Sequence, residues 1–187
     1  MKLNLQSLFI LRFIKSNILA ATYLMPVLFI AEGISKENSI SVDFNPYTQN
    51  IKNESIAIDM VPILGGSFLM GTLIEHANSL DETPEHKVVV SDFWMSKYEI
   101  TWQQYDAFVY GDFDHEQFQP SANLKKMGID AITGATTPYV EMSFGMGKET
   151  YPAINITHYA AMQYSRWVTA KTGVFHRLPT EAEWEYA

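Results

Sequence analysis

The spacing of apolar positions changes along the chain and predicts extended segments before any helix. "IAIDMVPILGGSFLMG", residues 56–71, is apolar and rich in strand-forming side chains, and predicts two short strands joined by a hairpin turn at Gly65-Gly66. "HKVVVSDFWMSKYEI", residues 86–100, has apolar residues on both faces. It predicts a buried extended stretch that is interrupted near Ser91-Asp92.

Two helix starts carry a capping box, in which a Thr and a Gln or Glu three residues later bond each other's free backbone N–H. Thr101 and Gln104 begin "TWQQYDAFVY", and Thr180 and Glu183 begin the helix of "RLPTEAEWEYA". Negative charge in the first turn also suits the dipole of the second helix. Helices are therefore predicted to begin at Thr101 and Thr180.

A third helix is predicted between Thr157, as its N-cap, and Gly173, as its C-terminal stop. An apolar stripe runs along it at helical spacing, formed by Ala160, Tyr164, Trp167 and Val168. Residues 111–152 show no clear period and predict a long ordered loop with at most short elements. Since the strands cluster early and do not alternate with helices, the pattern favours an α+β fold rich in loops.

The N-terminus has the pattern of a targeting segment. Lys2, Arg12 and Lys15 precede the apolar run "NILAATYLMPVLFIA", and Ala31-Glu32-Gly33 offers a cleavage triplet. We expect residues 1–33 to be a signal peptide or a retained anchor, residues 34–55 a flexible lead-in, and residues 56–187 the folded part. The protein is then exported to the periplasm or outside the cell, and touches a membrane only if its N-terminal segment is retained.

Charge and composition exclude several functional classes. The 187 residues carry a formal net charge of −8 and a pI near 5.0, which argues against nucleic acid as a partner and against binding to an anionic membrane surface. There is no cysteine, so disulfides, zinc–thiolate sites and thiol nucleophiles are excluded within these residues. Neither observation names a substrate.

Three short stretches resemble ligand sites but depart from them. "GMGKET", residues 145–150, lacks a phosphate loop's first glycine, because Met142 stands there, and Glu149 replaces its Ser or Thr. "DFDHE", residues 112–116, lacks the spacing of a calcium loop. We interpret the first as a glycine-rich turn and the second as a solvated acidic loop. "DETPEH", residues 81–86, is interpreted as the turn that aims the following strand into its sheet.

The remaining candidates are single titratable residues. The histidines show no ligand spacing, and no Ser/His/Asp set stands out; they are His76, His86, His115, His158 and His176. Glu99, between Tyr98 and Ile100, is predicted to lie in buried surroundings and to be hydrogen-bonded for a structural reason. The sequence therefore assigns no catalytic residue, no cofactor-binding residue and no metal ligand.

Four stretches, taken in order, are similar to the formylglycine-generating enzyme family, also called sulfatase-modifying factors. They are "GGSFLMG", "DETPEHKVVVSDFWMSKYEIT", "YPAINITHYAAMQYSRWV" and "RLPTEAEWEYA". The departures are Ala153, where the family usually has Val, and Ser165, where many relatives have Cys. The resemblance implies a variant of the C-type-lectin-like fold, of which residues 56–187 are the N-terminal, incomplete portion.

The resemblance also implies where the chemistry of such a domain lies. The family's calcium-binding residues, and the paired cysteines that hold copper in its oxidising members, follow the "RLPTEAEWE" helix, so no functional residue is carried over to this chain. The parent is either an oxidase that converts a sulfatase cysteine to formylglycine or a non-catalytic exported binding or scaffold module. The 187-residue chain itself is expected to be inactive, with no cofactor of its own. A sulfatase or another protein substrate is the expected partner of the complete domain.

An incomplete domain is expected to leave apolar surface uncovered. Tyr164, Trp167 and Trp184 are predicted to need partners from outside the chain. The isolated chain is then expected to bind a hydrophobic dye and to unfold without a sharp transition.

Overall fold

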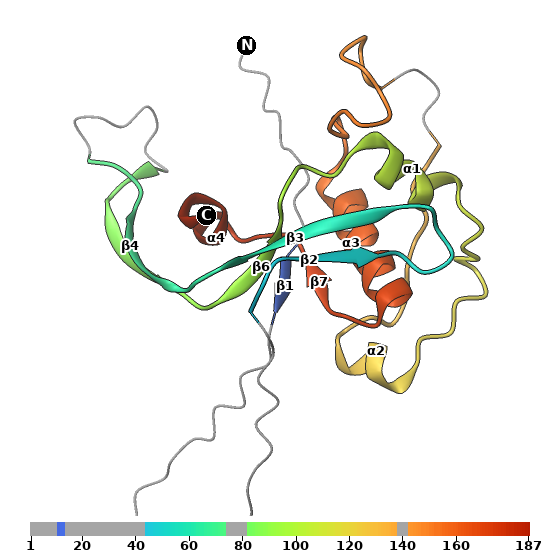
Figure 1. Ribbon diagram of the computed structural model, residues 1–187, viewed down its shortest axis with the longest axis horizontal. Coiled ribbons are helices and arrows are strands. Elements are labelled where there is room, and N and C mark those ends of the chain that lie inside the picture. Colours follow the sequence, from blue (N-terminus) through green and yellow to red (C-terminus); the bar gives the residue numbers. More distant parts are fainter. Residues whose placement is uncertain (1–10, 14–43, 74–81, 138–141) are drawn as a thin grey trace, which may run out of the picture.

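A five-stranded antiparallel sheet lies at the centre of the computed structural model (Figure 1), which describes residues 11–13, 44–73, 82–137 and 142–187. Its strands are β1 (Leu11–Phe13), β2 (Tyr47–Asn50), β3 (Ala57–Ile63), β6 (Phe93–Ser96) and β7 (His176–Arg177). Their spatial order is β2-β3-β6-β1-β7. Helices pack on this sheet and a two-stranded ribbon extends from it, so the predicted α+β class is confirmed.

Strand β2 lies within the segment that was predicted to be a flexible lead-in, and for these residues that prediction is wrong. The strand pairs with β3 from Tyr47↔Met60 to Asn50↔Ala57. Just before it, the ring of Phe44 packs edge-on against Trp94 at 4.5 Å, and the Trp94 indole N–H donates to the Asn45 carbonyl at 3.1 Å. The folded part therefore begins at least twelve residues before Ile56 (at Phe44), because short polar strands gain stability only from their neighbours.

The ribbon formed by β4 (Gly66–Met70) and β5 (His86–Val90) is called the arm below, and in Figure 1 it curves away from the sheet. The pairs Ile63↔Phe93 and Gly66↔Val90 belong to one antiparallel register that continues from β3 and β6 into the arm. Gly65-Gly66 is thus not a hairpin turn, and that prediction is wrong. The two predicted strands are present, but they follow each other along one side of a long ribbon.

A bend between residues 64–65 and 91–92 separates the arm from the central sheet. The Gly65 N–H donates to the Asp92 carboxylate at 2.6 Å, which replaces the ladder bond lost at the bend. A side chain on Gly65 would collide with backbone atoms of Val90 and Asp92. The predicted interruption near Ser91-Asp92 is therefore confirmed, and the glycine is needed for close approach of the two strands.

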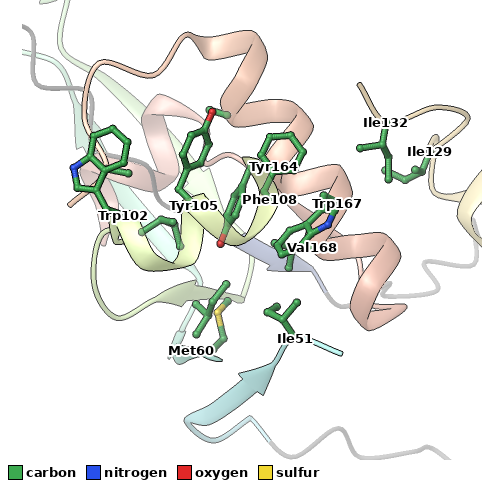
Figure 2. Packing of buried hydrophobic residues seen from close by; sticks show 14 of the residues in the cluster. Ile51, Met60, Trp102, Tyr105, Phe108, Ile129, Ile132, Tyr164, Trp167 and Val168 are labelled. Carbon is green, nitrogen blue, oxygen red and sulfur yellow. The ribbon is translucent and has the colours of Figure 1, made fainter. Parts of the chain in front are cut away.

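The main hydrophobic core lies between the sheet and two helices, α1 (Trp102–Tyr110) and α3 (His158–Thr172), as Figure 2 shows. Both helices begin as predicted. Thr101 and Gln104 form the full capping box, and the Thr157 hydroxyl accepts from the Ala160 N–H at 3.2 Å. Helix α3 ends at Gly173 in the left-handed conformation, φ 73°.

Tyr164 and Trp167 on α3 are fully buried by the chain itself. The ring of Phe108 on α1 lies 5.9 Å from the ring of each, edge-on to Tyr164 and tilted to Trp167, and Figure 2 shows the three rings between the helices. The prediction that these two side chains need partners from outside the chain is therefore wrong. The apolar stripe of α3 was predicted correctly. It packs against α1, which ends at Tyr110, about fifty residues before α3 begins.

Helix α4 (Glu181–Tyr186) has the predicted capping box at Thr180 and is fixed by a two-bond ion pair. Arg177 Nη1 and Nη2 donate to the Glu183 carboxylate at 2.9 and 2.6 Å. The Tyr186 ring packs on Phe68 of the arm at 5.3 Å. Trp184, by contrast, is 57% exposed, in agreement with the predicted uncovered surface at this helix.

The long segment between α1 and α3 is largely irregular, as predicted, where it is described. The described part of this segment contains one short helix, α2 (Ala122–Lys126), whose N-cap is Ser121. Strand β1, paired with both β6 and β7, falls inside the segment 1–33 that was predicted to be a signal or anchor. Among the described residues, no helix has the length and apolar character needed to cross a membrane.

Candidate functional site

A cavity of about 890 Å³ opens between α1, the start of α3 and the irregular segment that joins them. Its walls are mainly apolar and aromatic, with side chains that include Trp102, Tyr105, Val109, Met142, Ile154 and Tyr159. This is the size of a site for a drug-sized molecule or a few residues of a peptide. The residues come from four separate stretches of sequence, so the cavity is a product of the tertiary fold.

The wall formed by α1 is held in place through its N-terminus. Gln104, the capping-box partner, also donates its side-chain N–H to the Ala57 carbonyl of β3 at 2.6 Å. The first free N–H groups of the helix, on Trp102 and Gln103, donate to the carbonyls of Tyr151 and Glu149, each at 2.9 Å. The helix start therefore ties the segment that follows residue 142 to the sheet.

The opposite wall is tied to α3 by a buried amide. Gln163, only 4% exposed, accepts from the Thr133 N–H at 2.9 Å, and the Tyr159 hydroxyl donates to the Thr133 hydroxyl oxygen at 3.2 Å. These bonds fix residues 133–137 beside the start of α3. Both walls are therefore preformed rather than dependent on a ligand for their shape.

Two charged side chains, Asp106 and Lys148, line the cavity. The Lys148 ammonium lies 5.5 Å from the centre of the Trp102 ring, within the range of a cation–π interaction. Burial and, to a smaller extent, the charge of Asp106 raise the pKa of Tyr105 to about 12. Burial likewise raises the pKa of Tyr164. Both phenols stay neutral near pH 7, so they suit packing and hydrogen bonding rather than proton abstraction.

The rim of the cavity exposes large apolar side chains. Tyr110 and Tyr159 line the opening, and Phe144, Met146 and Tyr151 lie exposed on the neighbouring loop. The loop includes Phe144 and Glu149 in the left-handed backbone region, with φ near 51° and 56°. Exposed aromatic groups around a hollow are typical of surfaces that bind other proteins or peptides.

The stretch "GMGKET" contributes to this cavity as a turn, in agreement with its interpretation. Gly147 has φ 108°, and a side chain there would collide with the Tyr151 ring. The backbone thus passes close to a neighbour, which is what the glycine-rich turn was predicted to allow. Lys148 of the same stretch lines the cavity, a placement that the sequence analysis missed.

The acidic stretch "DFDHE" forms a turn. Asp114 accepts the backbone N–H groups of Glu116 and Gln117 at 3.0 and 2.9 Å. His115 packs against the Phe113 ring at 4.8 Å. This agrees with an acidic loop, and across the described ranges no group of three or more His, Asp and Glu side chains is placed to hold a metal ion.

In its described part, residues 82–86, the stretch "DETPEH" leads into β5, as predicted. The Glu82 carbonyl accepts from the Thr72 N–H at 2.8 Å, and His86 is the first residue of the strand, paired with Met70. Asp81 lies outside the described residues, as does His76. The four other histidines lie on separate elements: the arm, the loop after α1, α3 and β7.

Glu99 does not lie in the buried surroundings that were predicted. Its neighbour Tyr98 is 63% exposed, with the Lys97 ammonium 5.1 Å above its ring, while Ile100 is buried. Glu99 itself is half-buried and does not line the cavity. The residues that do form the cavity, such as Asp106 and Gln163, gave no local signal, because only the packing of distant segments brings them together.

Comparison with a family model agrees with the boundaries of the fold. The model described as the sulfatase-modifying factor enzyme 1-like domain matches residues 47–187. The matched region begins at the first residue of β2 and includes the whole cavity lining. No solved structure matches the chain.

Curated relatives carry two different names. The chain is 28% identical over 138 residues to a protein named serine/threonine-protein kinase pkn1 of Chlamydia pneumoniae, which covers 73% of this chain and 20% of the relative. It is 27% identical over 150 residues to the formylglycine-generating enzyme of Mus musculus, covering 68% and 39%. With the formylglycine-generating enzyme of Streptomyces coelicolor it shares 31% over 149 residues, covering 68% and 46%. The chain thus spans less than half the length of each of these relatives.

Proposed function

We propose that this chain, which belongs to the sulfatase-modifying factor enzyme 1-like family, supplies the part of a formylglycine-generating-enzyme-like domain that binds a protein substrate, and that its own role is recognition. The observation that carries this proposal is the preformed cavity with its exposed aromatic rim. A hollow of this kind suits an extended peptide segment whose side chains enter it. We propose for the whole domain the C-type-lectin-like variant of the α+β class.

The residues present do not fit an oxidising centre. Copper(I) is held by soft ligands such as thiolates, and the chain contains no cysteine. Among the described residues, no three or more His, Asp and Glu side chains are gathered as a metal site such as that of calcium requires. If the parent protein is an oxidase that acts on a sulfatase cysteine, copper and its thiolates belong to residues outside this sequence.

A buried donor in the cavity wall supports peptide recognition. The indole N–H of Trp102 has no hydrogen-bond partner among the residues with described placement, although the side chain is only 4% exposed. An unpaired buried donor costs about 1–3 kcal/mol, which a peptide carbonyl reached by a small shift of the ring would recover. Such a contact recognises the main chain of the peptide, so any preference for particular side chains would come from the other walls of the cavity.

A second candidate is a non-catalytic binding or scaffold module on the same fold. The relatives named as kinases favour it, since they match this chain over 73 to 82% of its length under a name that is unrelated to formylglycine. Both candidates share peptide binding in the cavity and differ only in whether oxidation follows. The protein partner of the parent, a sulfatase or another protein, is part of the proposal.

Binding is tested by titrating the chain with a fluorescent peptide that contains the C-x-P-x-R sulfatase motif and with a scrambled peptide. Tyr110→Ala, at the cavity rim, should weaken binding about fivefold to tenfold, as expected for an interface aromatic worth 1 kcal/mol or more. Tyr98→Ala is the matched control, because it removes an equally exposed tyrosine away from the cavity. Equal affinity of both variants and the unmodified chain would remove the cavity from consideration.

The recognition-only role is tested separately by chemistry. The chain is incubated with the same peptide, oxygen and copper, and the product is assayed for an aldehyde. We expect none. An aldehyde produced by the 187 residues alone would contradict this part of the proposal but leave peptide binding intact.

Export is proposed from the N-terminal sequence and is tested by expressing the chain in a bacterium and fractionating the cells. An N-terminus starting near residue 33 on the periplasmic material indicates a cleaved signal, and an intact N-terminus in the membrane fraction indicates an anchor. Intact protein confined to the cytosol would refute both.

A further inference from the structure

Strand β1 stands in an unusual position in the central sheet. It is an interior strand, lying between β6 and β7, yet it comes from the first thirteen residues and is joined to β2 only through residues 14–46 (Figure 1). Of the described strands, β6 and β7 pair with each other nowhere and are held together through β1. The space that β1 fills is called the slot below.

Both walls of the slot are fixed without β1. On one side, β6 pairs with β3 over four residues, from Met60↔Ser96 to Ile63↔Phe93, and its side chains are buried. On the other side, the His176 N–H of β7 donates to the Thr169 hydroxyl at 2.9 Å, and Arg177 bonds Glu183. Two anchored strand edges therefore face each other across the width of one strand.

Strand β1 itself is short, with three residues. It pairs with β6 at three positions, Leu11↔Met95, Arg12↔Trp94 and Phe13↔Phe93, and with β7 at two. A strand of three residues contributes few ladder hydrogen bonds.

The sequence of β1 also has a competing use. Leu11–Phe13 lies within the basic and apolar segment that has the pattern of an export signal or anchor. The same residues cannot sit in the sheet and also be cleaved away or inserted into a bilayer. Once they leave, two rows of backbone donors and acceptors are opened, which is a template for another strand.

We propose that the slot between β6 and β7 is a strand-acceptor site that takes an extended apolar peptide antiparallel to both walls, and that β1 is its exchangeable occupant. Main-chain hydrogen bonds to both walls give the affinity, and alternate side chains of the peptide pack on the two faces of the sheet. In this exchange β1 leaves the slot and the incoming strand takes its place between β6 and β7.

The test uses the full chain and a fluorescent probe peptide of residues 8–15, "LFILRFIK". Leu11→Cys combined with Met95→Cys places two cysteines at directly paired positions, whose Cα atoms in an antiparallel ladder lie about 4.5–5.5 Å apart, within disulfide range. Since the chain has no other cysteine, oxidation locks β1 in the slot and reduction releases it. The Leu11→Cys chain alone is the control for oxidation.

We expect the reduced chain to bind the probe and the oxidised chain to bind it at least about tenfold more weakly. A disulfide that links two copies would also support exchange, since the second copy's strand then occupies the slot. Equal binding by the locked and released forms would overturn the proposal, because the probe would then bind elsewhere.

A second probe keeps the test valid if the double variant folds poorly. In it, proline replaces the residue corresponding to Arg12, which pairs with both Trp94 and His176, so a ladder hydrogen bond is lost. The unmodified chain should bind this probe at least about tenfold more weakly than the original. Equal binding of the two probes, or no binding of the original at about 1 mM, would overturn strand exchange.

Discussion

The helical core and the arm both contain large apolar side chains but bury them to different extents. The core, formed by α1, α3 and the sheet, closes over Phe108, Tyr164 and Trp167, each completely buried. The described part of the arm joins only a small second cluster, in which Val90 packs with Phe93 and Met95 of β6 and with Tyr186 of α4, while Leu69 and Val89 on the outer face of the arm are exposed. A helix pair buries its apolar stripes against each other, whereas a two-stranded ribbon always has a face left over.

This difference affects the prediction that the isolated chain exposes apolar surface and unfolds without a sharp transition. Exposed apolar surface is present, but it lies on the arm, on α4 and around the cavity, and not in the helical core. We therefore expect dye binding, as the sequence predicted, but a cooperative transition of the core in place of the gradual unfolding that the sequence predicted. The following substitutions test that separation, in order of decreasing effect.

Trp167→Ala should have the largest effect, because it removes a fully buried ring between Phe108 and Tyr164. The free energy of unfolding is expected to fall by about 3–5 kcal/mol, measured by urea denaturation. Trp184→Ala is the matched control on the arm side, with an expected change within about 0.5 kcal/mol. Equal losses for the two variants would mean that α4 and the core unfold as one unit.

Gly65→Ala should loosen the arm, because the added methyl group meets the backbone of Val90 and Asp92, which cannot move aside as a side chain would. We expect a loss of about 1–3 kcal/mol, the usual cost of overpacking. Amide exchange should rise in β4 and β5 and stay low in α3. Ser67→Ala, exposed on the same arm, is the control, and faster exchange in α3 as well would show that the two regions are not independent.

Glu183→Gln tests helix α4, which packs on the arm, through the pH dependence of stability. Burial raises the pKa of Glu183, but the hydrogen bonds and charge of Arg177 and the bonds from Thr180 outweigh it and lower the pKa. The ionised carboxylate therefore stabilises the fold above the ordinary glutamate pKa, and this contribution is lost as pH falls through the lowered value in the folded state.

The expected loss for Glu183→Gln at pH 7 is about 1.5–3 kcal/mol, as for a hydrogen bond to a charged group. Thermal melts from pH 7 down to pH 3 should show a smaller pH dependence for this variant than for the unmodified chain. Glu181→Gln removes an exposed charge from the same helical turn and should leave the pH dependence nearly unchanged. A pH dependence unaltered by Glu183→Gln would contradict the assignment.

Val89→Thr should have the smallest effect on stability, within about 0.5 kcal/mol, because the side chain is 76% exposed on the arm. Its effect should be visible instead as reduced fluorescence of a bound hydrophobic dye at 25 °C. Unchanged dye fluorescence would place the binding surface at the cavity rim rather than on the arm.

The local signals in the sequence located the helix starts correctly. Thr101, Thr157 and Thr180 each cap a helix by accepting the backbone N–H of the residue three positions later. Such a cap needs no contact with the rest of the chain. Pairing between distant segments was not accessible in the same way. Gly65-Gly66 has the composition of a turn, and only the register with Val90 shows that the strand continues through it.

The cavity was beyond sequence reasoning for the same reason. Trp102 and Gln163 are 61 positions apart in the sequence, and both line one cavity only when α1 and α3 pack. Their individual types, an aromatic and an amide on amphipathic helices, are equally consistent with ordinary core positions. Family resemblance named the domain but carried no functional residue onto this stretch.

The tryptophans provide fluorescence signals that distinguish the buried core from helix α4. Trp94, Trp102 and Trp167 are each no more than 4% exposed and belong to the core cluster, while Trp184 stands in solvent on α4. Their emission should divide into a blue-shifted part shielded from acrylamide and a red-shifted part that acrylamide quenches readily. The unlabelled protein thus provides two spectral channels, one for the interior and one for the terminal helix.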